Sequence, residues 1–323
     1  MNETAEMSKE PTPSNRPTPS NREVEIREVG PRDGLQVEKP LSIEERISLI
    51  RAVYNAGATE IEAASFVSPK AVPAMAGADI LFKEIEKLDR VRYWALVPNL
   101  RGAEMALEAS ARALTVTISA SPAYNLRNVS MSIEDSIQEL TRITALASSS
   151  SGSGEILVDA VISCAFGSPY EGDISPLDVA VLTERLLEIG VTRVTWADTT
   201  GMATPRLITA LLESSSPPDV GLHLHDTRGT ALLNAYVALE HGVRRFDTAI
   251  GGLGGSPFAR GASGNLATCE LVYLLEEMGI ASGFDLGKLL EAASLAERLV
   301  GHPLPSKVYA AGPRISTGSE PSI

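Results

Sequence analysis

The sequence predicts an α/β protein with a (β/α)8 TIM-barrel fold and extra C-terminal helices. Short runs rich in β-branched residues alternate with longer segments of helical periodicity, which indicates parallel strands joined by helical crossovers. Eight such units over roughly 250 residues match the size of the barrel. An open doubly wound sheet is the alternative, but Gly30-Pro-Arg-Asp-Gly34 stands where that fold usually has its glycine-rich fingerprint.

The expected strands are short and apolar, as strands buried on both faces are. In chain order they are Val24–Val29, Glu60–Ala64, Arg92–Val97, Ala113–Ser119, Ile156–Ser163, Thr192–Ala197, Val220–His225 and Arg245–Ile250. In a barrel of this kind their carboxyl ends gather at one rim, which is where we expect the chemistry.

The segments between the strands have the apolar spacing of amphipathic helices. The clearest are Ser42–Ala56, Ser132–Ala147, Pro176–Ile189 and Thr230–His241, then Leu266–Met278, which closes the ring, and Asp285–Val300, which covers one side. Three helices begin with a side chain suited to cap their free N–H groups. These caps are Ser42 with Glu45, Ser132 with Asp135, and Ser175 before Pro176.

The composition is that of an ordinary globular protein, with 44% hydrophobic and 21% charged residues in a chain of 323. A formal net charge of -13 argues against a nucleic-acid or anionic-membrane surface, although a few local cations can still hold an anionic ligand. Cys164 and Cys269 provide neither a disulfide framework nor zinc-type spacing. The polar N-terminus and the lack of an apolar run of about 18 residues predict a cytoplasmic protein without signal peptide or membrane span.

Both ends are predicted to lie outside the folded domain. Residues 11–22 are one hexapeptide, Pro-Thr-Pro-Ser-Asn-Arg, written twice, and they cannot build a core, so residues 1–22 are expected to be a disordered tail. Residues 312–323 look the same, which leaves 23–311 as the barrel domain with its C-terminal helical cover. Ser148–Gly154 is expected to be a flexible connection.

Two of the four histidines, His223 and His225, stand near the end of the seventh expected strand. Alternate residues on a strand face the same side, so both imidazoles can be directed at one point. Two converging neutral imidazoles indicate a divalent-metal site. For this motif alone, an ordinary half-buried histidine bonded to backbone is an equally good interpretation.

Polar residues at the ends of other strands favour the metal site, because a barrel brings strand ends together. They are Arg32 and Asp33, Glu62, Ser163 and Cys164, Asp198 and Thr199, and the glycine-rich run from Gly251 to Asn265. The glycines of that run permit positive φ and close approach to a ligand. We expect the run to form a lid that closes on substrate, with a static connection as the alternative.

Together these segments resemble the 3-hydroxy-3-methylglutaryl-CoA lyase family, within the DRE-TIM metallolyase superfamily. The matching motifs are Val29-Gly-Pro-Arg-Asp-Gly-Leu-Gln36, Ser65-Phe-Val-Ser-Pro-Lys70, Pro169-Tyr-Glu-Gly172, His223-Leu-His-Asp-Thr227, Gly251-Gly-Leu-Gly-Gly255 and Gly261-Ala-Ser-Gly-Asn-Leu-Ala-Thr268. The resemblance extends from about Val24 to Val308, which is nearly all of the predicted domain.

The resemblance implies a metal held by Asp33, His223, His225 and Asn265. These ligands leave about two positions of an octahedral Mg2+ or Mn2+ for substrate oxygens. Zinc fits less well, because no cysteine ligand is placed and the site keeps its oxygen character.

The implied reaction is a retro-Claisen cleavage of a 3-hydroxyacyl-CoA, such as 3-hydroxy-3-methylglutaryl-CoA, to acetyl-CoA and a keto acid. The metal lowers the pKa of the substrate hydroxyl, and Asp33, His223 or a nearby water takes its proton. Arg32 is implied to stabilise the enolate, with an ion pair to a neighbouring carboxylate as the alternative.

Supporting roles follow from the same resemblance. Glu62 would orient groups around the metal, and Asp198 would fix a ligand or Arg32. The residues implied to lie near the acyl-CoA are Lys39, Asn128, Asp198, Gly254 and Gly255. For Lys39 a solvated surface position is nearly as good an interpretation. A homodimer is expected by analogy alone.

Three positions depart from the family pattern. Ser256 replaces the cysteine that protonates the leaving enolate, and an alkyl hydroxyl is a far weaker acid than a thiol. Asp159 stands where the family usually has arginine, so a contact to a carboxylate is lost or inverted. Cys269 replaces a usual glutamate, and it is expected inside the next helix, where it cannot act as the missing acid.

The departures leave several activities open. A metal-dependent carbon–carbon lyase is favoured, with citramalyl-CoA or a longer 3-hydroxy-3-alkylglutaryl-CoA as alternative substrates. An acyl-CoA condensing synthase or an aldolase on the same scaffold is the second hypothesis. The third is a ligand-binding barrel that has lost turnover with the cysteine.

Overall fold

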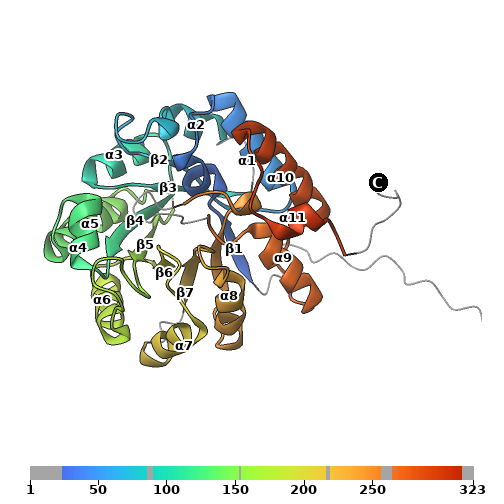
Figure 1. The fold of residues 1–323 in the computed structure, drawn as a ribbon. Helices are drawn as coiled ribbons and strands as arrows, with labels where there is room; N and C mark the ends of the chain where they lie inside the picture. The colour runs from blue at the N-terminus through green and yellow to red at the C-terminus, as the bar shows by residue number, and fades with distance from the viewer. Residues whose placement is uncertain (1–23, 86–89, 153, 216–218, 256–263, 315–323) are drawn as a thin grey trace, which may run out of the picture.

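A computed structural model of the chain describes residues 24–85, 90–152, 154–215, 219–255 and 264–314. Eight parallel strands form a closed barrel in which each strand pairs with the next and β8 pairs with β1 (Figure 1). The strands are β1 Glu25–Glu28, β2 Glu60–Ser65, β3 Arg92–Leu96, β4 Ala113–Ser119, β5 Leu157–Ser163, β6 Arg193–Asp198, β7 Val220–Leu224 and β8 Arg245–Thr248. The predicted (β/α)8 barrel is confirmed, and the open doubly wound sheet is wrong.

Helices surround the barrel (Figure 1). They are α1 Ile43–Asn55, α2 Ala78–Ile85, α3 Leu100–Glu108, α4 Pro122–Val129, α5 Ile133–Ser149, α6 Pro176–Glu188, α7 Pro205–Ser214, α8 Ala231–Glu240, α9 Thr268–Glu277, α10 Leu286–Val300 and α11 Lys307–Ala311. Within the described ranges, none of these helices combines the length and the apolar character that crossing a membrane requires.

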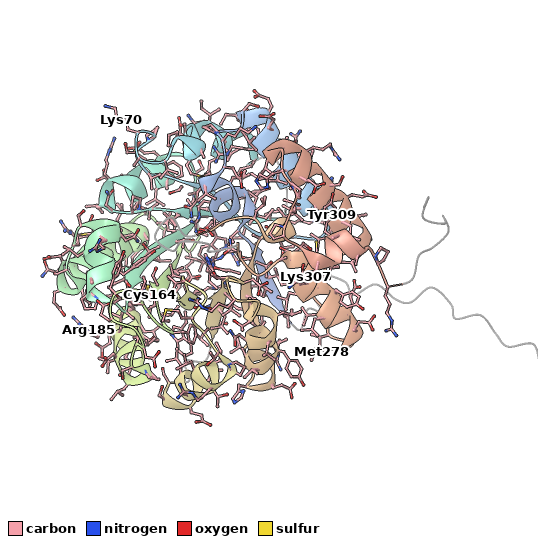
Figure 2. All side chains as sticks on the ribbon, in the orientation of Figure 1. Lys70, Cys164, Arg185, Met278, Lys307 and Tyr309 are labelled. Carbon is pink, nitrogen blue, oxygen red and sulfur yellow. The ribbon has the colours of Figure 1, made fainter. Side chains whose placement is uncertain are left out.

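The C-terminal cover has one more helix than the sequence predicts. The short helix α11 lies beside α10, where the Tyr309 hydroxyl donates to Glu297 at 2.9 Å (Figure 2). Glu270 of α9 accepts from Ser306 at 2.7 Å and from the Lys307 N–H at 2.6 Å. The C-terminal segment is therefore fixed to the last two long helices of the ring.

The remaining boundary predictions have mixed outcomes. Helix α5 continues through Ser149, so the predicted connection Ser148–Gly154 begins two residues too early. The N-terminal repeat, residues 1–22, and most of the predicted C-terminal tail lie outside the described residues.

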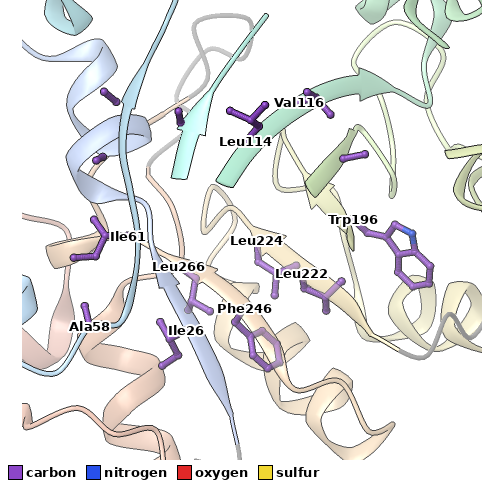
Figure 3. Packing of buried hydrophobic residues seen from close by; sticks show 14 of the residues in the cluster. Ile26, Ala58, Ile61, Leu114, Val116, Trp196, Leu222, Leu224, Phe246 and Leu266 are labelled. Atoms are coloured by element: carbon purple, nitrogen blue, oxygen red, sulfur yellow. The ribbon is translucent and has the colours of Figure 1, made fainter. Parts of the chain in front are cut away.

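Apolar side chains on the outer faces of the strands pack against the surrounding helices. Ile26, Leu222 and Phe246 show this arrangement (Figure 3). Because strand residues alternate in direction, their neighbours Arg27 and Asp247 point into the barrel. There they form a buried charged layer together with Asp159 of β5, below the strand ends that carry the site.

Two of the three predicted helix caps are confirmed. The Ser42 hydroxyl accepts the Glu45 N–H at 3.2 Å, and the Glu45 carboxylate accepts the Ser42 N–H at 2.7 Å, which completes a capping box. Helix α5 begins with the same box at Ser132. Ser175 occupies the cap position of α6, but its side chain accepts no N–H of that helix, so this prediction is wrong.

Ser42→Ala is expected to lower the free energy of unfolding by about 1 kcal/mol, because the Glu45 N–H of α1 loses its side-chain partner. Ser175→Ala is the matched control, since an exposed serine is removed from the same position of another helix without loss of a cap bond. Thermal unfolding of both variants checks the expectation, and equal midpoints would contradict it.

Candidate active site

A cavity of about 810 Å³ opens at the carboxyl ends of the strands. Most of the acidic and basic side chains that line it, Arg32, Asp33, His223, His225 and Asp247, come from the first, seventh and eighth strand units, and β2 adds Glu62. Gly255 also lines the cavity. Many of the apolar side chains that line it come from the second to fourth units, namely Val67, Val72, Met75, Leu96, Pro98 and Val129, and Val37, Val161 and Ala197 come from other units. The cavity lies where a TIM barrel carries its active site.

Three of the predicted metal ligands meet in this cavity. One ligand atom from each of Asp33, His223 and His225 lies within 4.8 Å of the other two, and all three residues are buried. The Nε2 atoms of the two histidines are 3.2 Å apart. Neighbouring ligands of an octahedral ion with bonds of about 2.1 Å lie about 3.0 Å apart, so the spacing suits a divalent cation.

The fourth predicted ligand, Asn265, is brought in by chain pairing beyond the strands. Pairing of β7 ends at Leu224, one residue before the predicted end, and His225 then forms an isolated antiparallel bridge with Asn265. The Asn265 amide donates to Asp33 Oδ2 at 2.8 Å and to the Leu253 carbonyl at 2.9 Å. Its buried Oδ1 has no hydrogen-bond partner among the described residues, so this oxygen is available to a ligand.

Asp247 determines which nitrogen of His223 faces the cluster. The carboxylate lies 3.2 Å from His223 Nδ1, so Nδ1 carries the proton and Nε2 presents its lone pair to the cluster. Burial lowers the pKa of His223, but the hydrogen bond and charge of Asp247 outweigh it, and the pKa is raised overall. Burial and the charge of His223 lower the pKa of His225 to about 4, so His225 is neutral at pH 7.

Asp33 is held ionised by its surroundings. Burial raises the pKa of its carboxyl, but Arg32 and the two imidazoles outweigh burial and lower the pKa overall. Arg32 donates Nη1 to Asp33 at 2.7 Å and Nε to Glu62 at 2.5 Å. Arg32 therefore forms ion pairs with Asp33 and Glu62, as the alternative interpretation of this residue expected. Glu62 keeps Oε1 buried without a partner among the described residues.

A buried glutamate that the sequence analysis missed joins the loops that carry the site. Glu28 Oε1 accepts from the Gly30 N–H at 2.8 Å and from the Ile250 N–H at 2.7 Å, and Oε2 accepts from Thr268 at 2.6 Å. Burial raises the pKa of Glu28 to about 7, against the lowering effect of these bonds. The loop after β1 and the loop after β8 therefore share one anchor.

Other predicted residues have different surroundings. Asp198 Oδ1 accepts from the Met202 and Ala203 N–H groups at 2.7 and 3.0 Å, so its hydrogen bonds order its own loop rather than Arg32. Burial raises the pKa of Asp198 to about 6. Asn128 is exposed and lines the cavity, whereas Lys39 is exposed and is not part of the lining.

Gly254, in the segment after β8, is required by its close packing against two of the predicted metal ligands. Gly254 has φ +109°, and a Cβ atom there would lie 2.6 Å from Asn265 Nδ2 and 3.4 Å from Asp33 Oδ2. The predicted positive φ is therefore confirmed at Gly254, and the backbone there approaches the side chains of Asn265 and Asp33 closely. Ser256 and the predicted lid through residue 263 lie outside the described residues.

The two other residues that depart from the family pattern, Cys269 and Asp159, are both buried. Cys269 is buried in α9, and burial raises the pKa of its thiol to about 12, so it is unsuited to act as an acid. Asp159 is fully buried and lies 2.9 Å from Arg27 of β1, so the acid on β5 is paired with an arginine from another strand. Arg27 and Asp247 were missed by the sequence analysis. The sequence signal that could have identified them is a charged residue inside an otherwise apolar strand.

Comparisons with known proteins agree with this geometry. Residues 23–296 match the family model described as HMGL-like. The mitochondrial hydroxymethylglutaryl-CoA lyase of Homo sapiens is 42% identical over 88% of this chain and 88% of its own. Hydroxymethylglutaryl-CoA lyase YngG of Bacillus subtilis (strain 168) is also 42% identical, over 88% and 95%.

A solved structure extends the similarity to three dimensions. An HMG-CoA lyase from Acenitobacter baumannii, in complex with coenzyme A and 3-methylmalate, superposes with a TM-score of 0.85 at 40% identity. The match covers 92% of this chain and 98% of that one. The barrel, the cluster of Asp33, His223 and His225, and the sequence similarity all lead to the same assignment. The chain belongs to the HMGL-like family of carbon–carbon lyases.

Proposed function

We propose that this protein cleaves 3-hydroxy-3-methylglutaryl-CoA to acetyl-CoA and a keto acid by a metal-dependent retro-Claisen reaction. The observation that carries the proposal is the buried cluster of Asp33, His223 and His225 in a cavity at the strand ends. Relatives about 42% identical to the chain are named for this activity. The coenzyme A complex of a similar structure supports an acyl-CoA substrate.

Asp33, His223, His225 and Asn265 would hold the cation, which we propose to be Mg2+ or Mn2+. One carboxylate, one amide oxygen and two imidazoles are a donor set suited to either ion, and the buried Asn265 Oδ1 lacks a partner among the described residues. When bound, the cation would polarise the substrate hydroxyl and lower its pKa.

The surrounding side chains would position the substrate and its charge. Arg32, fixed by Glu62 and Asp33, would direct its remaining N–H groups at the thioester oxygen, where negative charge develops as the carbon–carbon bond breaks. Both ring nitrogens of His223 would be occupied, Nδ1 by the proton that faces Asp247 and Nε2 by the cation, so Asp33 or a nearby water would accept the hydroxyl proton. Asn128, Gly255 and the other cavity-lining groups would contact the acyl-CoA.

The acid that protonates the product enolate would differ from that of the family, because Ser256 stands at the family's cysteine position. A serine hydroxyl would relay a proton from water rather than supply its own. The homodimer, the cytoplasmic location and contacts of Lys39 and Gly254 with substrate also stay predictions.

His225→Ala is expected to slow acetyl-CoA release from 3-hydroxy-3-methylglutaryl-CoA by more than about 100-fold, because one metal ligand is lost. His241→Ala is the matched control, since His241 is exposed at the end of α8. A coupled assay with Mg2+ or Mn2+ measures both. Wild-type protein that binds Mn2+ but cleaves no 3-hydroxyacyl-CoA would contradict the proposed activity.

Ser256→Cys is expected to raise the rate of acetyl-CoA release by about tenfold or more, because a thiol is a usable acid near neutral pH. Ser256→Ala is expected to be slower than wild type if the hydroxyl relays a proton. Cys269→Ser is the control for cysteine content and should leave the rate unchanged. A Ser256→Cys variant no faster than wild type would show that the thiol is not the missing element.

Mn2+ affinity is expected to fall as the pH decreases, because a proton on His223 blocks its lone pair. The pKa of His223 is raised above its ordinary 6.5, so the loss begins above pH 6.5 and approaches about tenfold per pH unit below the shifted pKa. His225, with a pKa of about 4, is neutral in this range, so calorimetry in several buffers at a pH below the shifted pKa of His223 should count about one released proton. A count of two released protons would contradict this assignment. The control is His302→Gln, which removes an exposed histidine and should leave the pH dependence of Mn2+ affinity unchanged.

A further inference from the structure

Beneath the metal cluster, charges from three strands form one connected chain. Arg27 of β1 donates Nε to Asp247 Oδ1 and Nη2 to Asp247 Oδ2, both at 2.8 Å. Its third nitrogen, Nη1, lies 2.9 Å from Asp159 Oδ2 on β5. Asp247 Oδ2 is also 3.2 Å from His223 Nδ1. The guanidinium therefore has an acidic partner at each of its three nitrogens, and it donates hydrogen bonds to both carboxylate oxygens of Asp247.

The surroundings make this chain rigid. Asp159 accepts the Thr195 hydroxyl at 2.9 Å, and the Arg27 guanidinium lies 4.9 Å from the centre of the Trp94 ring. Exposed fractions are 5% for Arg27, 0% for Asp159 and 7% for Asp247. Charges buried this deeply are stable only when they are paired, so Arg27 cannot exchange its partners for water.

We propose that Arg27 is a positioning residue for the metal centre, and that Asp159 keeps it in place. A two-point grip fixes the plane of the Asp247 carboxylate, so that Oδ2 faces the Nδ1 proton of His223. That hydrogen bond holds the imidazole in the tautomer whose Nε2 lone pair faces the cluster. The inference rests on the metal site in the proposed function. It assigns Asp159 the role of holding Arg27 in place.

The chain contains a matched arginine for comparison. Arg193 of β6 also approaches the Trp94 ring, at 5.6 Å, and it is paired with Glu25 at 2.7 Å. Among the contacts of the described residues, none joins Arg193 to Asp247. A lysine at either position keeps the positive charge but cannot grip a carboxylate at two points.

The test compares Arg27→Lys with Arg193→Lys in the full chain. Nitrogen-15 NMR of the metal-free protein, which has four histidines, reports the tautomer of His223. The Nδ1–H form should dominate in wild type and Arg193→Lys and should lose its dominance in Arg27→Lys. Calorimetry with Mn2+ should show affinity 10- to 100-fold weaker in Arg27→Lys, the range expected for outer groups of a metal site. Arg193→Lys should stay within about twofold of wild type.

Asp159→Asn is the second variant, in case Arg27→Lys does not fold. It keeps the shape of the side chain and an acceptor for Thr195, and it should weaken Mn2+ binding in the same direction as Arg27→Lys. An unchanged tautomer and an unchanged affinity in the folded variants would overturn the proposal. If wild type binds no Mn2+, the proposed metal site fails, and the tautomer comparison alone decides whether Arg27 positions His223.

Discussion

Pairing of β8 with β1 is the interaction on which the rest of the site depends. Four residue pairs join these strands, and this closure places the loop after β1 beside the segment after β8. Glu28 then binds backbone N–H groups of both loops, and Asn265 donates to Asp33 across the same junction. Asp33 and Asn265, which are more than 200 positions apart in the sequence, are therefore brought together in one proposed ligand set.

The site also depends on arginines that each form ion pairs with two buried carboxylates. Arg32 is shared by Asp33 and Glu62 at the rim, and Arg27 is shared by Asp159 and Asp247 one layer below. Each pairing leaves a carboxylate ionised where burial alone would favour its neutral form. The two layers are joined at His223, which contacts Asp247 below and faces His225 in the cluster.

The barrel could be predicted from the sequence because alternation of strands and helices is a local, periodic signal. The convergence of Asp33, His223 and His225 could be predicted too, since strand ends of a barrel meet at one rim. Glu28, Arg27 and Asp247 could not, because their roles depend on which side chains meet across the closed barrel. The failed cap at Ser175 has a similar cause: residue type favours a cap, but the side-chain orientation decides whether the bond forms.

The residues that line the cavity differ in kind around the ring. The proposed metal ligands belong to the first, seventh and eighth strand units, whereas many of the apolar lining residues belong to the second, third and fourth. Substitutions between residues 67 and 129 can therefore reshape the space for an acyl group while the ligand set stays intact. The proposed ligands and much of the apolar lining thus lie on different arcs of the barrel, so exchange of one arc is a practical route to lyases for other acyl groups.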